Sequence, residues 1–313
     1  MFVGDGLWVV DSYENFVEDN LVNGKPLIYL EDATNKTVAE AGQVILVNCE
    51  HIKVQNLNLS NTTIGIELWN TNKTIISQNN MANNGYGIRL GYSSNNNSIV
   101  GNKIANNWVG ISLSASSNNT LSGNNITANI DDGIHLWSSS NNTIVGNNIM
   151  ANNETGIRLY NSSNNIIYYN SFTDNTQQVY DYAWDYPGSP STNIWDDGYP
   201  SGGNYWSDYT GVDSNGDGIG DTPYTIDENN IDRYPLMGPF NSFNTSVGCS
   251  VDVISNSTIE DFRYFEPNGT IIMHVSNMTA DQAFGFCRLT IPHDVISPPY
   301  TVKVNDTTIR YQT

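Results

Sequence analysis

Oxygen-bearing side chains alternate with glycines in one short stretch, which reads Asp-Ser-Asn-Gly-Asp-Gly-Ile-Gly-Asp over residues 213–221. When such a loop curls, the side-chain oxygens at its first, third and fifth positions converge on one centre, and the backbone carbonyl at the seventh joins them. A glycine at the sixth position permits the sharp bend, and the ninth position adds a carboxylate, directly or through water. The stretch therefore predicts a structural calcium site with the ligands Asp213, Asn215, Asp217, Ile219 and Asp221.

The predicted calcium loop departs from an EF-hand at its twelfth position, where Tyr224 stands in place of a glutamate. A further carboxylate must then complete the ligand shell, and Asp208, Asp227 or Glu228 could supply it. No amphipathic helix flanks the loop, which argues against a calcium-sensing switch. The alternative is an acidic Asn/Gly turn that holds no ion.

A second set of residues recurs around the motif Gly-Ile-x-Leu, in which Ile and Leu point inward and x points outward. Stacked in register, x and the residue two places on give an outward face of charged and aromatic side chains. Aromatic rings can stack on sugar rings while arginines reach carboxylates or hydroxyls. We therefore expect a glycan-binding face, against the alternative of a solvated strand face with incidental aromatics. Its predicted contact residues are Trp69, Arg89, His135, Trp137, Arg158 and Tyr160.

Catalysis on this face would need acid and base groups. Asp131 and Asp132 lie beside His135 in the sequence, and Glu154 follows one repeat later. A glycosidase requires two carboxylates that flank the scissile bond, and this set imitates such a pair weakly. We keep Asp131, Asp132 and His135 as weak catalytic candidates; enzyme activity is uncertain, and the sequence favours a protein that is not an enzyme.

The element that must position these residues is a repeat of about 23 residues. Gly-Ile pairs begin at residues 65, 87, 110, 133 and 156, in steps of 22, 23, 23 and 23. Each unit holds short stretches with apolar residues two apart, separated by Asn, Gly and Ser, which favour tight turns. A unit this small cannot form a core alone, so the units must stack. The pattern predicts an all-β parallel β-helix with about 23 residues per coil.

Two columns of asparagine keep the same period and are interpreted as scaffold. An Asn at the same turn of every coil can bond to its copies and to the turn backbone. The columns are Asn83, Asn106, Asn129, Asn152 and Asn175, and Asn79, Asn102, Asn124, Asn147 and Asn170.

Four regions follow from these patterns. Residues 1–50 are expected to form irregular first coils with a side loop, and residues 51–175 the regular coils. Residues 176–245 lose the period and are rich in Tyr, Trp, Asp, Gly and Pro; because an open solenoid end exposes core and strand edges, this segment is expected to be a cap that includes the calcium loop. Residues 246–313 alternate apolar and polar residues between turns, which predicts a small antiparallel β-sandwich.

Composition limits the partners. The chain has 313 residues and a formal net charge of −20, which excludes nucleic acid as a natural partner and suits divalent cations or a saline exterior. Many Asn-X-Ser/Thr sequons are compatible with an exported glycoprotein. There is neither an apolar stretch long enough to span a membrane nor a signal peptide at Met1. We expect part of a longer exported chain, extracellular or on the cell surface, whose leader or anchor is missing.

Three cysteines leave two interpretations open. Cys249 and Cys287 lie in the same predicted unit and could form a disulfide in an oxidising compartment, or they could remain free. Cys49 stands within an apolar stretch and is expected to be a packed thiol.

The repeat Asn-Asn-Thr-Ile-x-Gly-Asn-Asn-Ile-x-x-Asn, as in residues 141–152, followed by Gly-Ile-x-Leu, resembles the NosD-type β-helix repeat of the pectin-lyase-like group. Residues 193–209, 213–221 and 232–237 resemble secreted archaeal members, and residues 213–221 also resemble dockerin and thrombospondin-type calcium loops. The resemblance covers most of residues 10–240 and implies a right-handed helix. It implies no activity, and since the chain lacks a His/Cys/Met cluster, the copper role of the family's namesake is not carried over.

Two classes of function compete. The favoured one is a secreted, calcium-stabilised β-helix surface protein with an adhesive, glycan-binding or envelope-structural role, whose partner is a polysaccharide or cell-surface glycan. A homo-polymer through solenoid ends or sandwich edges is a variant of this role. The alternative is a polysaccharide lyase, hydrolase or epimerase that acts on the outward face.

Overall fold

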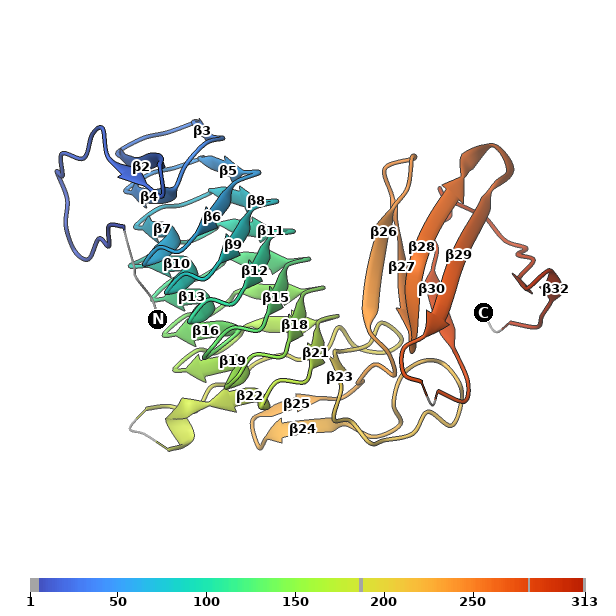
Figure 1. Cartoon of the computed structure of the whole chain (residues 1–313). Coiled ribbons are helices and arrows are strands. Elements are labelled where there is room, and N and C mark those ends of the chain that lie inside the picture. Colours follow the sequence, from blue (N-terminus) through green and yellow to red (C-terminus); the bar gives the residue numbers. More distant parts are fainter. Residues whose placement is uncertain (1–5, 186–187, 281, 312–313) are drawn as a thin grey trace. The chain divides into compact units, whose positions relative to one another are not determined.

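The structure is a computed structural model that describes residues 6–185, 188–280 and 282–311. The chain forms two compact units, one that ends at Pro239 and one that begins at Phe240. The first is a parallel β-helix and the second consists of three small antiparallel sheets among the described residues (Figure 1). The second unit thus begins six residues before the expected boundary at residue 246. Among the described residues, no helix is long and apolar enough to cross a membrane.

Three sheets run along the β-helix, and each regular coil contributes one strand to each. Sheet 1 consists of β1 (Leu21–Val22), β2 (Lys25–Glu31), β4 (Gln43–Val47), β7 (Ile64–Trp69), β10 (Tyr86–Gly91), β13 (Val109–Ser114), β16 (Ile134–Trp137), β19 (Thr155–Tyr160) and β22 (Gln177–Asp181). Sheet 2 consists of β3 (Thr37–Val38), β5 (Lys53–Gln55), β8 (Ile75–Ser77), β11 (Ser98–Val100), β14 (Thr120–Ser122), β17 (Thr143–Val145) and β20 (Ile166–Tyr168). Sheet 3 consists of β6 (Asn58–Ser60), β9 (Asn80–Ala82), β12 (Lys103–Ala105), β15 (Asn125–Thr127), β18 (Asn148–Met150), β21 (Ser171–Thr173) and β23 (Tyr205–Trp206).

The predicted 23-residue period is confirmed as the coil repeat. In sheet 1, the isoleucines of the five Gly-Ile pairs are direct partners on neighbouring parallel strands, from Ile66 to Ile157. Their side chains are fully buried, as are the leucines two residues on. Asparagines with positive φ angles occur at many of the turns between strands, where their short polar side chain tolerates the left-handed backbone.

Asparagine ladders fill the inner side of the turns. In the ladder from Asn79 to Asn170, each amide oxygen accepts bonds from the backbone N–H and the side-chain amide of the asparagine in the preceding coil; for Asn102 and Asn79 both distances are 3.0 Å. This predicted column is confirmed. The other column was wrong in its first two members, because Asn84 and Asn107 are buried in the ladder while Asn83 and Asn106 are exposed.

A third buried asparagine ladder was not predicted from the sequence. It consists of Asn97, Asn119, Asn142, Asn165, Asn193 and Asn230. Its last two members lie in the non-periodic segment, so the segment continues the hydrogen bonding of the regular coils. The same holds for Asn204, which extends the ladder that begins at Asn79.

The non-periodic segment closes the core of the β-helix with aromatic rings. Trp195 and Trp206 are fully buried among the last core residues. The Trp206 ring stacks between those of Phe172 and Tyr224, at centroid distances of 4.4 and 4.3 Å. The segment also contains a 3-10 turn, η1 (Tyr182–Trp184), and the hairpin β24 (Tyr224–Asp227) and β25 (Asn230–Asp232).

The second unit has a three-stranded antiparallel sheet of β26 (Phe240–Asn244), β27 (Ser250–Ser255) and β30 (Cys287–Thr290). A hairpin of β28 (Ser257–Phe265) and β29 (Thr270–Asn277), with the 3-10 turn η2 (Glu266–Asn268) between them, shares its core, and a short hairpin of β31 (Lys303–Val304) and β32 (Thr307–Thr308) follows. Phe243 stacks on Phe262 at 4.5 Å across the two layers. The small antiparallel β unit predicted for this region is confirmed.

All three cysteines are free thiols. Cys287 pairs with Ser255 across β30 and β27, whereas Cys249 precedes the other end of β27. Six residues of extended strand place the two cysteines about 20 Å apart, far beyond the 7 Å that a disulfide spans between Cα atoms. The disulfide interpretation is therefore wrong. Cys49 is buried as expected, and its burial raises the pKa of the thiol.

Candidate functional site

The outward face of sheet 1 carries the residues that the sequence singled out. Parallel pairing places His135 between Ser112 and Arg158, and Trp137 between Ser114 and Tyr160. In the preceding coils, Arg89 lies between Glu67 and Ser112. The predicted outward column therefore exists in the predicted register.

The first part of this face is covered. The N-terminal segment, residues 6–20, lies against β4 and β7, where Val9 packs with Trp69 in a small apolar cluster. Trp69 is only 6% exposed, its indole N–H donates to the Tyr13 hydroxyl at 3.0 Å, and its ring stacks on that of Tyr92. The prediction that Trp69 contacts a glycan is wrong for this conformation, because another part of the chain occupies its surface.

Arg89 is also engaged by the protein. Its guanidinium bonds to the fully buried Glu67 at 3.0 Å and lies near the rings of Trp8 and Trp69, at 5.5 and 5.8 Å. The backbone N–H of Val9 donates to the other Glu67 oxygen at 3.0 Å. Burial raises the pKa of Glu67 to about 7. Arg89 therefore holds the N-terminal segment in place and has no free guanidinium for a sugar carboxylate.

The second part of the face is open and aromatic. Trp137 is 42% exposed, and its ring stacks on that of Tyr160 with 4.1 Å between centroids and 26° between planes. Tyr182 of η1 extends the row by an edge contact with Tyr160 at 6.0 Å. On the other side of Trp137, the neighbouring strand offers only the small side chain of Ser114.

A charged cluster lies beside the aromatic row. The Arg158 Nε donates to an Asp132 oxygen at 2.7 Å, and its Nη2 lies 3.4 Å from an Asp131 oxygen. Asp132 is buried, and the Thr155 hydroxyl donates to its second oxygen. The ring of Tyr180 lies 5.6 Å from the guanidinium. Two carboxylates thus already engage Arg158, and its contact with a glycan stays a prediction.

The pKa values of Asp131 and His135 in this cluster are shifted in opposite directions. Burial, followed by the nearby charge of Asp132, raises the pKa of Asp131, while Arg158 opposes the change. Burial lowers the pKa of His135, with attraction to Asp132 as an opposing effect. His135 Nδ1 lies 3.9 Å from Asp132, and its buried Nε2 has no hydrogen-bond partner. The cluster thus combines a carboxyl that retains its proton longer with an imidazole that is neutral at pH 7, the groups that general acid–base chemistry needs.

The structure brings together the three weak catalytic candidates and adds neighbours that were not predicted. Trp108 lies one coil before Asp131 and lowers its pKa by a hydrogen bond. Tyr180 and Tyr182 lie one coil after Arg158 and Tyr160. Trp108 is 23 residues before Asp131, so the coil period was a signal for it; the tyrosines follow the last regular coil, where the period ends.

The predicted calcium loop is a tight turn built on its own carboxylates. The Asp213 carboxylate accepts from the backbone N–H groups of Gly216, Asp217 and Gly218, at 2.7, 3.2 and 2.8 Å. Asp217 accepts from the N–H of Ile219 and from the Asn215 amide, and Asp221 accepts from Ser214. Gly218 has φ +82°, which suits the predicted bend.

No group of three or more His, Cys, Asp or Glu side chains in the described part of the chain gathers as a metal site would require. The loop carboxylates accept from backbone amides in this conformation, and an ionised carboxylate has further lone pairs that could face an ion.

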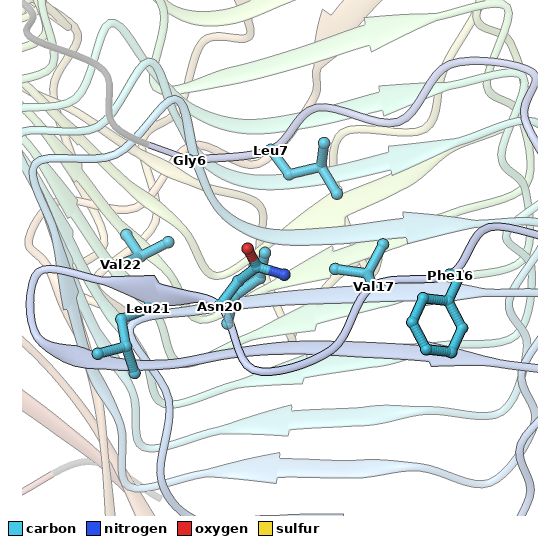
Figure 2. A pocket seen from close by; sticks show the side chains of 8 residues that line it. Gly6, Leu7, Phe16, Val17, Asn20, Leu21 and Val22 are labelled. Carbon is cyan, nitrogen blue, oxygen red and sulfur yellow. The ribbon is translucent and has the colours of Figure 1, made fainter.

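One hollow of about 370 Å³ lies at the other end of sheet 1, between the N-terminal segment and β1 and β2 (Figure 2). Figure 2 shows mainly apolar side chains around it, among them Leu7, Val17 and Val22. No charged residue lines it, so it offers shape but no chemistry, and we place the candidate site at the aromatic row and charged cluster instead.

Comparisons with known proteins identify the family of the chain. A family model described as periplasmic copper-binding protein (NosD) matches residues 32–211, which is more than half of the chain. No curated protein matches the chain.

Several solved structures are similar to part of the chain. A mutant of the periplasmic alginate epimerase AlgG is 23% identical over 49% of this chain and 44% of its own, with a TM-score of 0.39. The A-module of the Azotobacter vinelandii mannuronan C-5 epimerase AlgE4 is 18% identical over 44% of this chain and 43% of its own, with a TM-score of 0.33. The Dettilon tailspike protein is 11% identical over 74% of this chain and 71% of its own, with a TM-score of 0.30. The chain spans less than half the length of both epimerases, and these similarities concern the fold alone.

Proposed function

The chain belongs to the NosD family, whose model matches more than half of it, and from this premise we propose a secreted or envelope β-helix protein that binds a polysaccharide or cell-surface glycan. The binding face consists of the outward side chains of β16, β19 and β22. The family is described as periplasmic, which supports a location outside the cytoplasm.

The exposed ring pair of Trp137 and Tyr160 is the observation that carries the proposal. An exposed tryptophan on a rigid strand offers a flat apolar surface at little entropic cost. One ring face of Trp137 is stacked on Tyr160, while the adjacent strand toward the N-terminus carries only Ser114. A sugar ring stacked there would lie beside His135, whose ring is 6.1 Å from that of Trp137.

A glycan array, followed by titration of each hit, tests the proposal. Trp137→Ala should weaken binding at least tenfold, equivalent to about 1.4 kcal/mol, and leave the circular dichroism spectrum unchanged because the ring is exposed. Phe284→Ala is the matched control, since it removes a 74% exposed aromatic ring of the second unit. Equal affinities for the wild type and Trp137→Ala would exclude this face.

Catalysis at the same face is the second candidate, favoured by the opposed pKa shifts of Asp131 and His135. A lyase, hydrolase or epimerase could use Asp131 as a proton donor and the imidazole of His135 as a base. Bound glycans should then be shortened, unsaturated or epimerised after incubation, and His135→Ala should abolish the change while binding persists. Unchanged glycans with the wild type would leave binding as the function.

Calcium binding by residues 213–221 remains a further part of the proposal. The acidic residues and the glycine at the sixth position support it, and the hydrogen bonds from backbone amides to Asp213 already curl the loop. Calorimetric titration with calcium should show one site that Asp213→Ala and Asp217→Ala remove, and chelation should lower the melting temperature. No heat and no calcium by elemental analysis would refute it.

Copper, which the family description names, does not fit the residues of this chain. The chain has four histidines and three cysteines, and the described part gathers no three of the usual metal-binding side chains. Assembly into a homo-polymer stays a prediction that light scattering would test.

A further inference from the structure

We propose that the glycan bound by the face of β16, β19 and β22 carries protonated amino groups, as in a polymer of unacetylated glucosamine. The inference rests on the proposed function and names the chemical class of its ligand. It replaces the expectation that arginines on the face would select acidic sugars.

The cations of the face are already used by the protein. Arg158 is held by Asp132 at 2.7 Å and by Asp131 at 3.4 Å, and Arg89 is held by Glu67 at 3.0 Å beneath Trp8. A uronic acid would have to share either guanidinium with a carboxylate that the fold holds against it, which weakens the net attraction. His135 adds no positive charge near neutral pH, because burial lowers its pKa.

The anions of the face outnumber the cations. Asp131, Asp132 and Glu154 surround the single guanidinium of Arg158, which leaves an excess of two negative charges when all are ionised. Glu154 is exposed, and its charge acts on both Asp131 and Arg158. Burial, and after it the charges of Asp132 and Glu154, raise the pKa of Asp131, and a ligand ammonium group placed beside it would favour the ionised carboxylate.

The arrangement provides both contacts that an amino sugar needs. The ring of His135 meets that of Trp137 edge-on at 6.1 Å, and Asp132 lies 3.9 Å from the same histidine. Asp131 lies six residues before Trp137, and Glu154 lies six residues before Tyr160. An oligosaccharide of several units that runs along the strands would therefore reach both the rings and these carboxylates. The net charge of −20 adds a long-range attraction for a cationic polymer.

The test compares three oligosaccharides of equal length by calorimetry at pH 6: a glucosamine oligomer, its N-acetylated counterpart and an oligouronate. We expect the glucosamine oligomer to bind at least tenfold more tightly than the acetylated one at low salt. This preference should shrink at high salt, because screening weakens exposed charge pairs. The oligouronate should bind most weakly.

Two variants make the result specific. Glu154→Gln should reduce the preference for the amine several-fold, whereas Glu260→Gln, which removes an exposed carboxylate of the second unit, should not. Binding of the glucosamine oligomer that is insensitive to both Trp137→Ala and Glu154→Gln is general attraction to an acidic surface and overturns the inference. Equal affinity for the acetylated oligomer, or preference for the uronate, also overturns it and leaves glycan binding intact. Failure of all three oligomers and of the glycan array together refutes the proposed function itself.

Discussion

Removal of one rung of a buried asparagine ladder should cost far more stability than removal of the exposed asparagine next to it. Asn124 is 1% exposed. Its amide oxygen accepts from the backbone and side-chain N–H groups of Asn102, both at 3.0 Å. Its amide nitrogen donates to Ile99 O and to the Asn147 amide oxygen, both at 2.9 Å.

Asn124→Ala removes these four hydrogen bonds and leaves the buried backbone N–H of Asn102 without its acceptor. An orphaned buried donor costs about 1–3 kcal/mol, and the other three bonds contribute about 1 kcal/mol each, so the expected loss is roughly 4–6 kcal/mol. Asn125→Ala, one residue on, removes an exposed side chain that accepts a single bond from Asn148, so its expected cost is about 0.5 kcal/mol or less.

Urea unfolding followed by circular dichroism measures both variants on the unglycosylated protein. The two should show similar denaturant slopes and well-separated midpoints. If the two variants lose the same free energy of unfolding within about 1 kcal/mol, the ordinary scatter of single substitutions, the ladders fill space but do not stabilise the stacking of the coils.

Three further predictions concern the cap and the thiols. Trp206→Ala, at a ring that is 1% exposed, should lower the free energy of unfolding by about 3–5 kcal/mol. Amide hydrogen exchange should accelerate more in the C-terminal coils next to the cap than in the N-terminal coils. Burial raises the pKa of Asp232 to about 7; because the folded state then holds this proton more tightly than the unfolded state, stability should fall as pH rises from about 4 to 7. Melting temperatures across this range should fall less steeply for Asp232→Asn, and parallel curves would contradict the assignment. Thiol titration should find two cysteines that react in the folded protein and a third, Cys49, only after unfolding; a disulfide in intact-mass analysis would contradict this.

The coil architecture was predictable because the apolar residues of each coil recur at a fixed spacing in the sequence. Ile66 and its copies must be buried, and a regular step places them in one column on a parallel sheet. Where the spacing is ambiguous the prediction erred. Asn83-Asn84 and Asn106-Asn107 are doublets, and the sequence does not say which member of each faces inward, since both satisfy nearly the same step.

The chemistry of the outward face was less predictable, because it depends on contacts between residues with no periodic relation. Trp69 is covered by a segment more than fifty residues earlier, which carries no repeat signal. Asp132 reaches Arg158 across 26 residues, a diagonal contact between neighbouring coils. The types of residue on the face could be predicted, but their availability to a ligand could not.

The asparagine ladders make neighbouring coils interchangeable at their junctions. Every internal rung accepts from the rung before and donates to the rung after with nearly the same geometry, so a coil meets the same bonding surface wherever it is inserted. Duplication or excision of one whole repeat would preserve the hydrogen bonds at every junction between coils. It would change only the distance between the N-terminal segment and the aromatic cap. Insertions or deletions in the gene could therefore lengthen or shorten the β-helix in steps of one coil, about 4.8 Å along the axis, while both ends of the β-helix stay unchanged.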